Sequence, residues 1–224
     1  MKIFTFLPSK EMNLQNKVCF EINGIDPQVV VGPQIFDSRN NAIVEHQGKT
    51  KYKKEELRDS EGFIFIDSDI YFGEGTIARL INLAKSKPKS VISGYYRIRN
   101  PHSKDTKMSF WTTKNVSFDS AISVQEISEC ENNVIKAYAI SAGFMFIPST
   151  VLEKLEYPYF MPTVEKNTES VSIMGEDVSF SKKCNKKKIP IYVDKALRLR
   201  HLGVDNVEAP LPGAYYAMKQ RARK

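Results

Sequence analysis

The segment from Gly62 to Asp69 reads Gly-Phe-Ile-Phe-Ile-Asp-Ser-Asp, so a short apolar run leads directly into two carboxylates separated by one residue. The run has the length and composition of a buried β-strand. Polar side chains at the carboxyl end of a buried strand are typical of open α/β sheets, where ligands bind beyond the strand ends. We therefore predict a binding site near residues 67–69.

Strand-like and helix-like patterns alternate on both sides of this segment. The strands are expected at residues 3–7, 29–31, 62–66 and 90–93, and the helices at 13–22, 38–47, 53–60 and 75–86. This alternation predicts an α/β fold with a mostly parallel central sheet and helices on both faces.

The second half of the chain is less regular. We expect edge strands at 110–112 and 122–127, further strands at 136–140, 144–147 and 189–193, helices at 150–155 and 178–186, and a flexible loop at 157–169. The edge strands predict a small antiparallel sheet beside the central one. One domain is expected over 1–205, with halves at 1–94 and 95–205, followed by a basic tail at 206–224.

The composition is that of an ordinary globular protein. The chain has 224 residues, of which 42% are hydrophobic and 26% charged, and this length can bury one substantial core. No apolar run approaches the roughly 20 residues that span a bilayer, and the apolar run at 3–7 is too short for a signal peptide. The odd number and wide spacing of Cys19, Cys130 and Cys184 fit neither a disulfide framework nor a zinc site. We expect a soluble protein in a reducing, cytoplasmic setting.

The net charge of +7 comes largely from lysine clusters at 49–54, 182–188 and 219–224. Such clusters are most often solvated faces. The alternatives are a phosphate-rich partner, a nucleotide, or a weak contact of the basic tail with an anionic surface.

The Asp67-Ser68-Asp69 element is the strongest candidate for chemistry. Mg²⁺ and Mn²⁺ prefer oxygen ligands, often one or two carboxylates together with substrate phosphates. Two carboxylates at the end of a strand are costly to hold together unless a cation neutralises them. A cation at this position would stabilise a diphosphate leaving group. The alternative is a turn in which the aspartates cap the next element.

Three further features have both a structural and a functional interpretation. Glu176-Asp177 stands where a helix begins, so helix capping is one explanation and acid–base chemistry the other. His201 is either a structural residue or a ligand. Ser38-Arg39 is either a helix N-cap with a surface arginine, or an arginine beside a nucleotide base or phosphate.

Taken in chain order, these features resemble a single family. The residues that carry the resemblance are Pro8-Ser9, Ser38-Arg39-Asn40, Asp67-Ser68-Asp69, Ser141-Ala142-Gly143-Phe144, Glu176-Asp177 and His201. The ordered set is similar to GT-A-fold glycosyltransferases, particularly compact forms that resemble family 2 enzymes and those encoded by large viruses and phages. The resemblance covers about residues 1–205. It implies a Rossmann-like fold and transfer of a sugar from a nucleoside-diphosphate sugar, with UDP as the default nucleotide, to a carbohydrate acceptor.

The resemblance also implies roles for single residues. The nucleotide-binding group would be Pro8, Ser9, Asp37, Arg39, Asp67 and Ser68, and Gly143 would leave room for the donor sugar. Mn²⁺ or Mg²⁺ would be held directly by Asp69, with Asp67 contacting the metal or the ribose. His201 would be a further metal ligand or a contact for the diphosphate. Asp177 would be the general base on the acceptor hydroxyl, with Glu176 beside it. One departure from the family pattern is that the second strand ends in Val31-Gly32-Pro33-Gln34, without a carboxylate before Asp37.

Aromatic side chains offer a surface for sugar rings. Tyr95, Trp111 and Phe144 are the acceptor-side candidates, and core packing is the alternative for each.

Two other functions compete with sugar transfer. A nucleotidyltransferase usually has a glycine-rich loop after its first strand, which Leu7–Glu11 lacks. A nucleic-acid-binding module would explain the positive charge, but it leaves the carboxylate motif without a role, and we expect no nucleic-acid partner.

Overall fold

The computed structural model describes residues 2–7, 14–31, 34–46, 61–98, 107–117, 119–166 and 171–202. The helix expected at 53–60 and the tail at 206–224 lie outside the described residues, as do Pro8 and Ser9.

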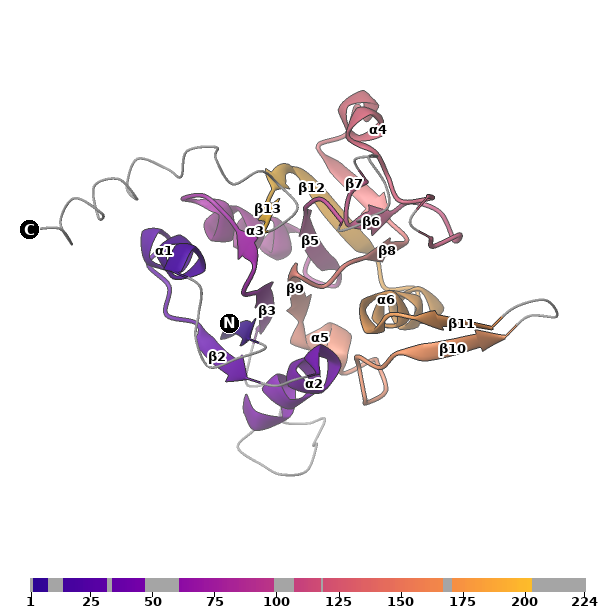
Figure 1. Ribbon diagram of the computed structural model, residues 1–224, viewed down its shortest axis with the longest axis horizontal. Helices are drawn as coiled ribbons and strands as arrows, with labels where there is room; N and C mark the ends of the chain where they lie inside the picture. Colours follow the sequence, from indigo (N-terminus) through magenta and orange to yellow (C-terminus); the bar gives the residue numbers. More distant parts are fainter. Residues whose placement is uncertain are drawn as a thin grey trace, which may run out of the picture.

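A seven-stranded sheet forms the centre of the molecule (Figure 1). Its order is β2 (Gln28–Val31), β1 (Lys2–Leu7), β3 (Gly62–Asp67), β9 (Phe144–Pro148), β5 (Val91–Tyr95), β12 (Ile191–Arg198) and β7 (Val134–Ala137). β1 is parallel to both β2 and β3, and β12 is parallel to β5. β9 runs antiparallel between β3 and β5, and β7 is an antiparallel edge. The predicted α/β class is confirmed.

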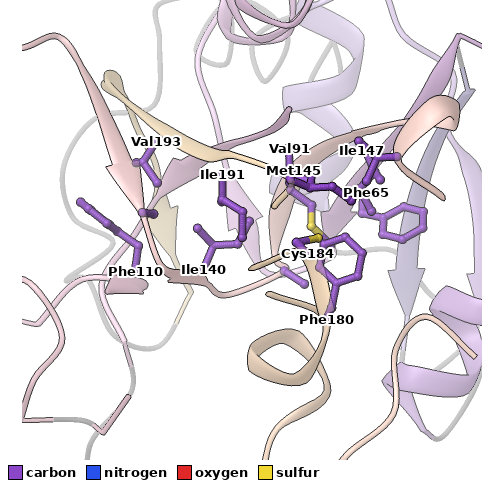
Figure 2. Packing of buried hydrophobic residues seen from close by; sticks show 14 of the residues in the cluster. Phe65, Val91, Phe110, Ile140, Met145, Ile147, Phe180, Cys184, Ile191 and Val193 are labelled. Atoms are coloured by element: carbon purple, nitrogen blue, oxygen red, sulfur yellow. The ribbon is translucent and has the colours of Figure 1, made fainter. Parts of the chain in front are cut away.

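Alternate residues of β3 pack against helices on opposite faces of the sheet. Ile64 and Ile66 lie in one core cluster with residues of α1 (Leu14–Ile22) and α3 (Thr76–Ser86). Phe63 and Phe65 lie in a second cluster with residues of α2 (Ile35–His46), α5 (Ser149–Leu152) and α6 (Glu176–Lys186). Figure 2 shows the part of this second cluster around Phe180 and Cys184 of α6. Burial on both faces explains why β3 is apolar at every position before Asp67.

Short antiparallel pairs surround the central sheet. They are β4 (Ile70–Tyr71) with β13 (Arg200–His201), β6 (Phe110–Trp111) with β8 (Ala139–Ile140), and β10 (Thr163–Lys166) with β11 (Val171–Met174). The β10–β11 hairpin extends beside α6 (Figure 1) and is joined to it by a 2.9 Å contact between the hydroxyls of Thr163 and Ser179. The small antiparallel sheet that was expected beside the central sheet is therefore replaced, among the described residues, by three separate two-stranded sheets.

Three local predictions need correction. The strand expected at 122–127 is wrong, because α4 (Val124–Glu129) begins there with a capping box between Ser123 and Glu126. The loop expected at 157–169 contains β10. The strand expected to end before Gly94 continues to Tyr95, which pairs with Arg198 of β12. Among the residues that the structure describes, no helix is long and apolar enough to cross a membrane.

Candidate active site

Asp67 stands at the carboxyl end of β3, and its carboxylate faces the guanidinium of Arg39. The Nη2 atom of Arg39 donates to Oδ1 at 2.8 Å and to Oδ2 at 3.0 Å. The Arg39 side chain is 3% exposed, whereas that of Asp67 is 26% exposed. Burial raises the pKa of Asp67, and the arginine opposes that rise. Asp67 is thus an anchored carboxylate with part of its surface open to a ligand.

Arg39 also pairs with the opposite side of the site. Its Nη1 donates to Oε1 of Glu176, the first residue of α6. Burial alone would lower the pKa of Arg39, but the carboxylates of Asp67, Glu176 and Asp177 outweigh it and the pKa is raised. The arginine therefore remains charged and links the end of β3 to the start of α6. Of the two alternatives for Ser38-Arg39, the helix N-cap with a surface arginine is wrong, because α2 begins at Ile35 and Arg39 is buried within it.

Asp177 follows Glu176 in the first turn of α6. Burial, and next the nearby charge of Glu176, raise its pKa to about 6, while Arg39 acts in the opposite direction. Its Oδ1 accepts a 2.7 Å hydrogen bond from the backbone amide of Val178. A carboxyl group with a pKa near 6 is ionised at neutral pH yet binds a proton readily, which are the properties of a general base.

Asp69 and His201 form a second pair of side chains at this end of the sheet. Nε2 of His201 lies 3.2 Å from Oδ2 of Asp69, and Nδ1 lies 3.0 Å from the carbonyl oxygen of Arg97. The β4–β13 ladder holds the two residues together, because Leu202 donates its amide to the Asp69 carbonyl at 2.9 Å. The rings of His201 and Tyr96 also pack in a T-shaped arrangement, with centroids 5.2 Å apart.

Gly143 lies directly behind Asp67. Its carbonyl accepts the Asp67 amide at 2.9 Å, and its own amide donates to the hydroxyl of Tyr96 at 3.0 Å. A Cβ at this position would clash with the Tyr96 hydroxyl and lie 3.2 Å from Oδ2 of Asp67. Burial raises the pKa of Tyr96 well above its usual value, so its hydroxyl keeps its proton. The glycine is required by this close packing around Asp67.

Several predicted site residues stand apart from this cluster. Asp37 is exposed in the first turn of α2, and Ser68 is half-buried in the turn after β3. The three acceptor candidates are all buried: Tyr95 packs on Phe110, Trp111 donates to the Ser117 carbonyl, and Phe144 packs on Phe72. Their burial favours the core-packing alternative over a sugar-binding surface.

Asn40 makes contacts that were not predicted from the sequence. Its side chain holds the backbone of Tyr159 and Phe160. A sequence signal for this was available, because Arg39 and Asn40 lie four residues from Ile43 and Phe36 respectively, on the apolar face of a helix. Polar residues on the buried face of a helix indicate specific partners.

The acidic residues and His201 fit a divalent cation in one respect. Asp69 and His201 supply an oxygen and a nitrogen that are already close together. Among the described residues, no group of three His, Cys, Asp or Glu side chains converges as a self-contained metal centre. A site with two protein ligands suits Mg²⁺ or Mn²⁺, which usually complete their coordination with water and substrate phosphates.

Comparisons with known proteins give a likeness of fold. No protein-family model and no curated protein matches the sequence. Among solved structures, A197 from STIV matches with a TM-score of 0.60 and 20% identity, over 92% of this chain and 87% of that one. GalNAc-T7, solved with UDP, GalNAc and Mn²⁺, matches with a TM-score of 0.50 and 11% identity, over 93% of this chain and 39% of that one. The fold is GT-A-like. The chain spans well under half the length of GalNAc-T7, so the likeness concerns its architecture alone.

Proposed function

We propose that this protein is a metal-dependent glycosyltransferase that transfers a sugar from a nucleoside-diphosphate sugar, with UDP favoured, to a hydroxyl group of a carbohydrate acceptor. The observation that carries the proposal is the meeting of the β3 carboxyl end and the start of α6 through Arg39, within a GT-A-like fold. This junction brings a carboxylate suited to proton transfer near two aspartates suited to a donor. The proposed division is donor binding by 1–94 and acceptor binding by 95–205.

Asp177 acts as the general base in this proposal. As the acceptor oxygen forms a bond to the anomeric carbon, the bond from that carbon to the diphosphate oxygen breaks, and the hydroxyl proton moves to the Asp177 carboxylate. The products are the glycosylated acceptor with inverted configuration and the free nucleoside diphosphate. The raised pKa of Asp177 supports the role, because a carboxylate with an ordinary pKa would be a weaker base.

Asp69 and His201 would hold the metal ion. When bound, Mn²⁺ or Mg²⁺ would offset the negative charge that develops on the departing diphosphate. Asp67, already fixed by Arg39, would contact the ribose or the metal with the part of its carboxylate that remains exposed. The peptide at Gly143 keeps Asp67 in place, and the Tyr96 hydroxyl, rather than a donor sugar, occupies the space that a side chain at Gly143 would take.

Calorimetric titration of the protein with UDP, in the presence and absence of Mn²⁺, tests the donor side of the proposal. We expect UDP binding that requires the metal, together with a rise in Tm when both are present. Release of UDP from a panel of UDP-hexoses, with water taking the sugar where no carbohydrate acceptor is present, then identifies the donor. Stabilisation by nucleoside triphosphates without metal, or by oligonucleotides, would refute the proposal.

A further inference from the structure

Helix α2 buries three consecutive polar residues, Ser38, Arg39 and Asn40, and the last two are each only 2% exposed as whole residues. Burying a guanidinium and a side-chain amide is unfavourable unless both are hydrogen-bonded. The Arg39 and Asn40 side chains contact different parts of the site, and together they form what we term the Arg39–Asn40 clasp.

The Arg39 part of the clasp bridges two elements that lie far apart in the sequence. Asp67, at the end of β3, is 28 residues away, and Glu176, at the start of α6, is 137 residues away. Hydrogen bonds between an arginine and carboxylates are directional, so they constrain orientation as well as distance. The first turn of α6 is thereby linked to the carboxyl end of β3, where the sugar donor is proposed to bind.

The Asn40 part of the clasp holds the chain that precedes the β10–β11 hairpin. Its Nδ2 donates to the Phe160 carbonyl at 2.6 Å, and its Oδ1 accepts the amides of Tyr159 and Phe160 at 2.9 and 3.1 Å. The Phe160 ring stacks on Phe180 of α6, with centroids 4.6 Å apart and planes at 16°. The guanidinium of Arg39 lies 5.9 Å from the centre of the Phe160 ring. The two parts of the clasp therefore converge on α6 by separate routes.

We propose that Arg39 and Asn40 are positioning residues: they set the location of Asp177 relative to Asp67, and hence the alignment of base and donor, without touching substrate themselves. This inference rests on the proposed function in taking Asp177 as the base. Positioning of this kind matters because a displacement of about 1 Å in an active site lowers the rate by about 100-fold.

Arg39→Lys tests the proposal, with Arg79→Lys as the matched control. Lysine keeps the charge but loses the planar fork. Arg79 makes a comparable fork outside the site, with Nε and Nη2 donating to the Asp194 carboxylate at 2.7 and 3.0 Å. Three measurements are made on each full-length variant: hydrogen exchange of the Ser179 amide, which closes the first turn of α6 on the Gly175 carbonyl, calorimetric affinity for UDP with Mn²⁺, and UDP release from UDP-hexoses.

For Arg39→Lys we expect faster exchange at Ser179, nearly unchanged affinity for UDP with Mn²⁺, and UDP release slower by about 10- to 100-fold. Arg79→Lys should alter none of the three. Two results would overturn the proposal. One is normal exchange with normal UDP release in Arg39→Lys. The other is a loss of UDP affinity as large as the loss of release, because Arg39 would then act on the donor directly.

Asn40→Ala provides the second variant, for the case in which Arg39→Lys does not fold. Faster exchange at Ser179, beyond the direct effect at Tyr159 and Phe160, supports the clasp, and a change limited to those two amides contradicts it. The exchange measurements need no ligand. A wild-type protein that fails to bind UDP would therefore refute the proposed function, while exchange alone would still decide whether the clasp holds α6.

Discussion

The carboxylate of Asp67 lies with both oxygens within 3.0 Å of Nη2 of Arg39, whereas the carboxylate of Asp69, two residues later, lies 3.2 Å from Nε2 of His201. The two aspartates therefore have different partners. The Asp67 carboxylate is held in place by a buried cation, while the Asp69 carboxylate has a neighbour that can itself bind a metal ion. Substitutions at the two positions should differ in their consequences accordingly.

Asp69→Ala should remove metal-dependent nucleotide binding. Loss of a group that merely supports a metal ligand costs about 10- to 100-fold in metal affinity, so we expect loss of the proposed ligand itself to weaken Mn²⁺-dependent UDP affinity by at least about 100-fold. Isothermal titration calorimetry measures this directly. Asp26→Ala, at an exposed aspartate, is the control and should bind as wild type. UDP affinity that still depends on manganese in the Asp69 variant would refute the metal-binding role.

Asp177→Asn should leave donor binding intact and slow transfer. Asparagine keeps the shape of the side chain but cannot accept the proton, and loss of a general base costs about 10²- to 10⁴-fold in kcat. The measurement is kcat for UDP release together with the Kd for UDP and Mn²⁺. Asp119→Asn, at an exposed position, makes the same chemical change outside the site. Near-normal turnover in the Asp177 variant would mean that the base is elsewhere or that the reaction retains configuration.

The general architecture was predictable because it depends on local patterns. The apolar run before Asp67 and the alternation of strands with helices indicate an α/β sheet without reference to distant residues. The antiparallel orientation of β9 was not predictable in this way. Both faces of β9 are covered, so Phe144–Pro148 is apolar throughout and reads like a parallel central strand.

The contacts within the site were less predictable than the residues that make them. Arg39 and Asp67 could be selected by residue type and by position in the chain, but the pairing of Arg39 with Glu176 depends on how α2 and α6 pack on one face of the sheet. A single sequence can indicate that a buried polar residue has a partner, but it does not show which distant residue that partner is. The capping box at Ser123 and Glu126 is different, because its spacing is visible in the sequence and predicts a helix where a strand was expected.

The pH dependence of turnover should report the ionisation of Asp177. Its pKa is raised to about 6 by burial and by Glu176. Since the base works only when ionised, kcat should rise about tenfold per pH unit below that value and level off above it. Glu176→Gln removes the neighbouring negative charge, so it should lower the pKa of Asp177 and move the rising limb to lower pH. A limb that moves to higher pH, or does not move, would contradict this assignment.

Gly143→Ala should destabilise the protein because no space exists for a methyl group beside Tyr96 and Asp67. The added Cβ would clash with the Tyr96 hydroxyl and lie 2.8 Å from the Cζ atom of that ring, and Tyr96 is itself buried. Overpacking of this kind costs about 1–3 kcal/mol in the free energy of unfolding. Denaturant unfolding of the variant measures the loss. Gly73→Ala is the matched control, because a Cβ there meets its nearest neighbour, Oγ1 of Thr76, at 4.0 Å, and it should unfold close to wild type. Equal stability of the two variants would show that the packing behind Asp67 is looser than its distances indicate.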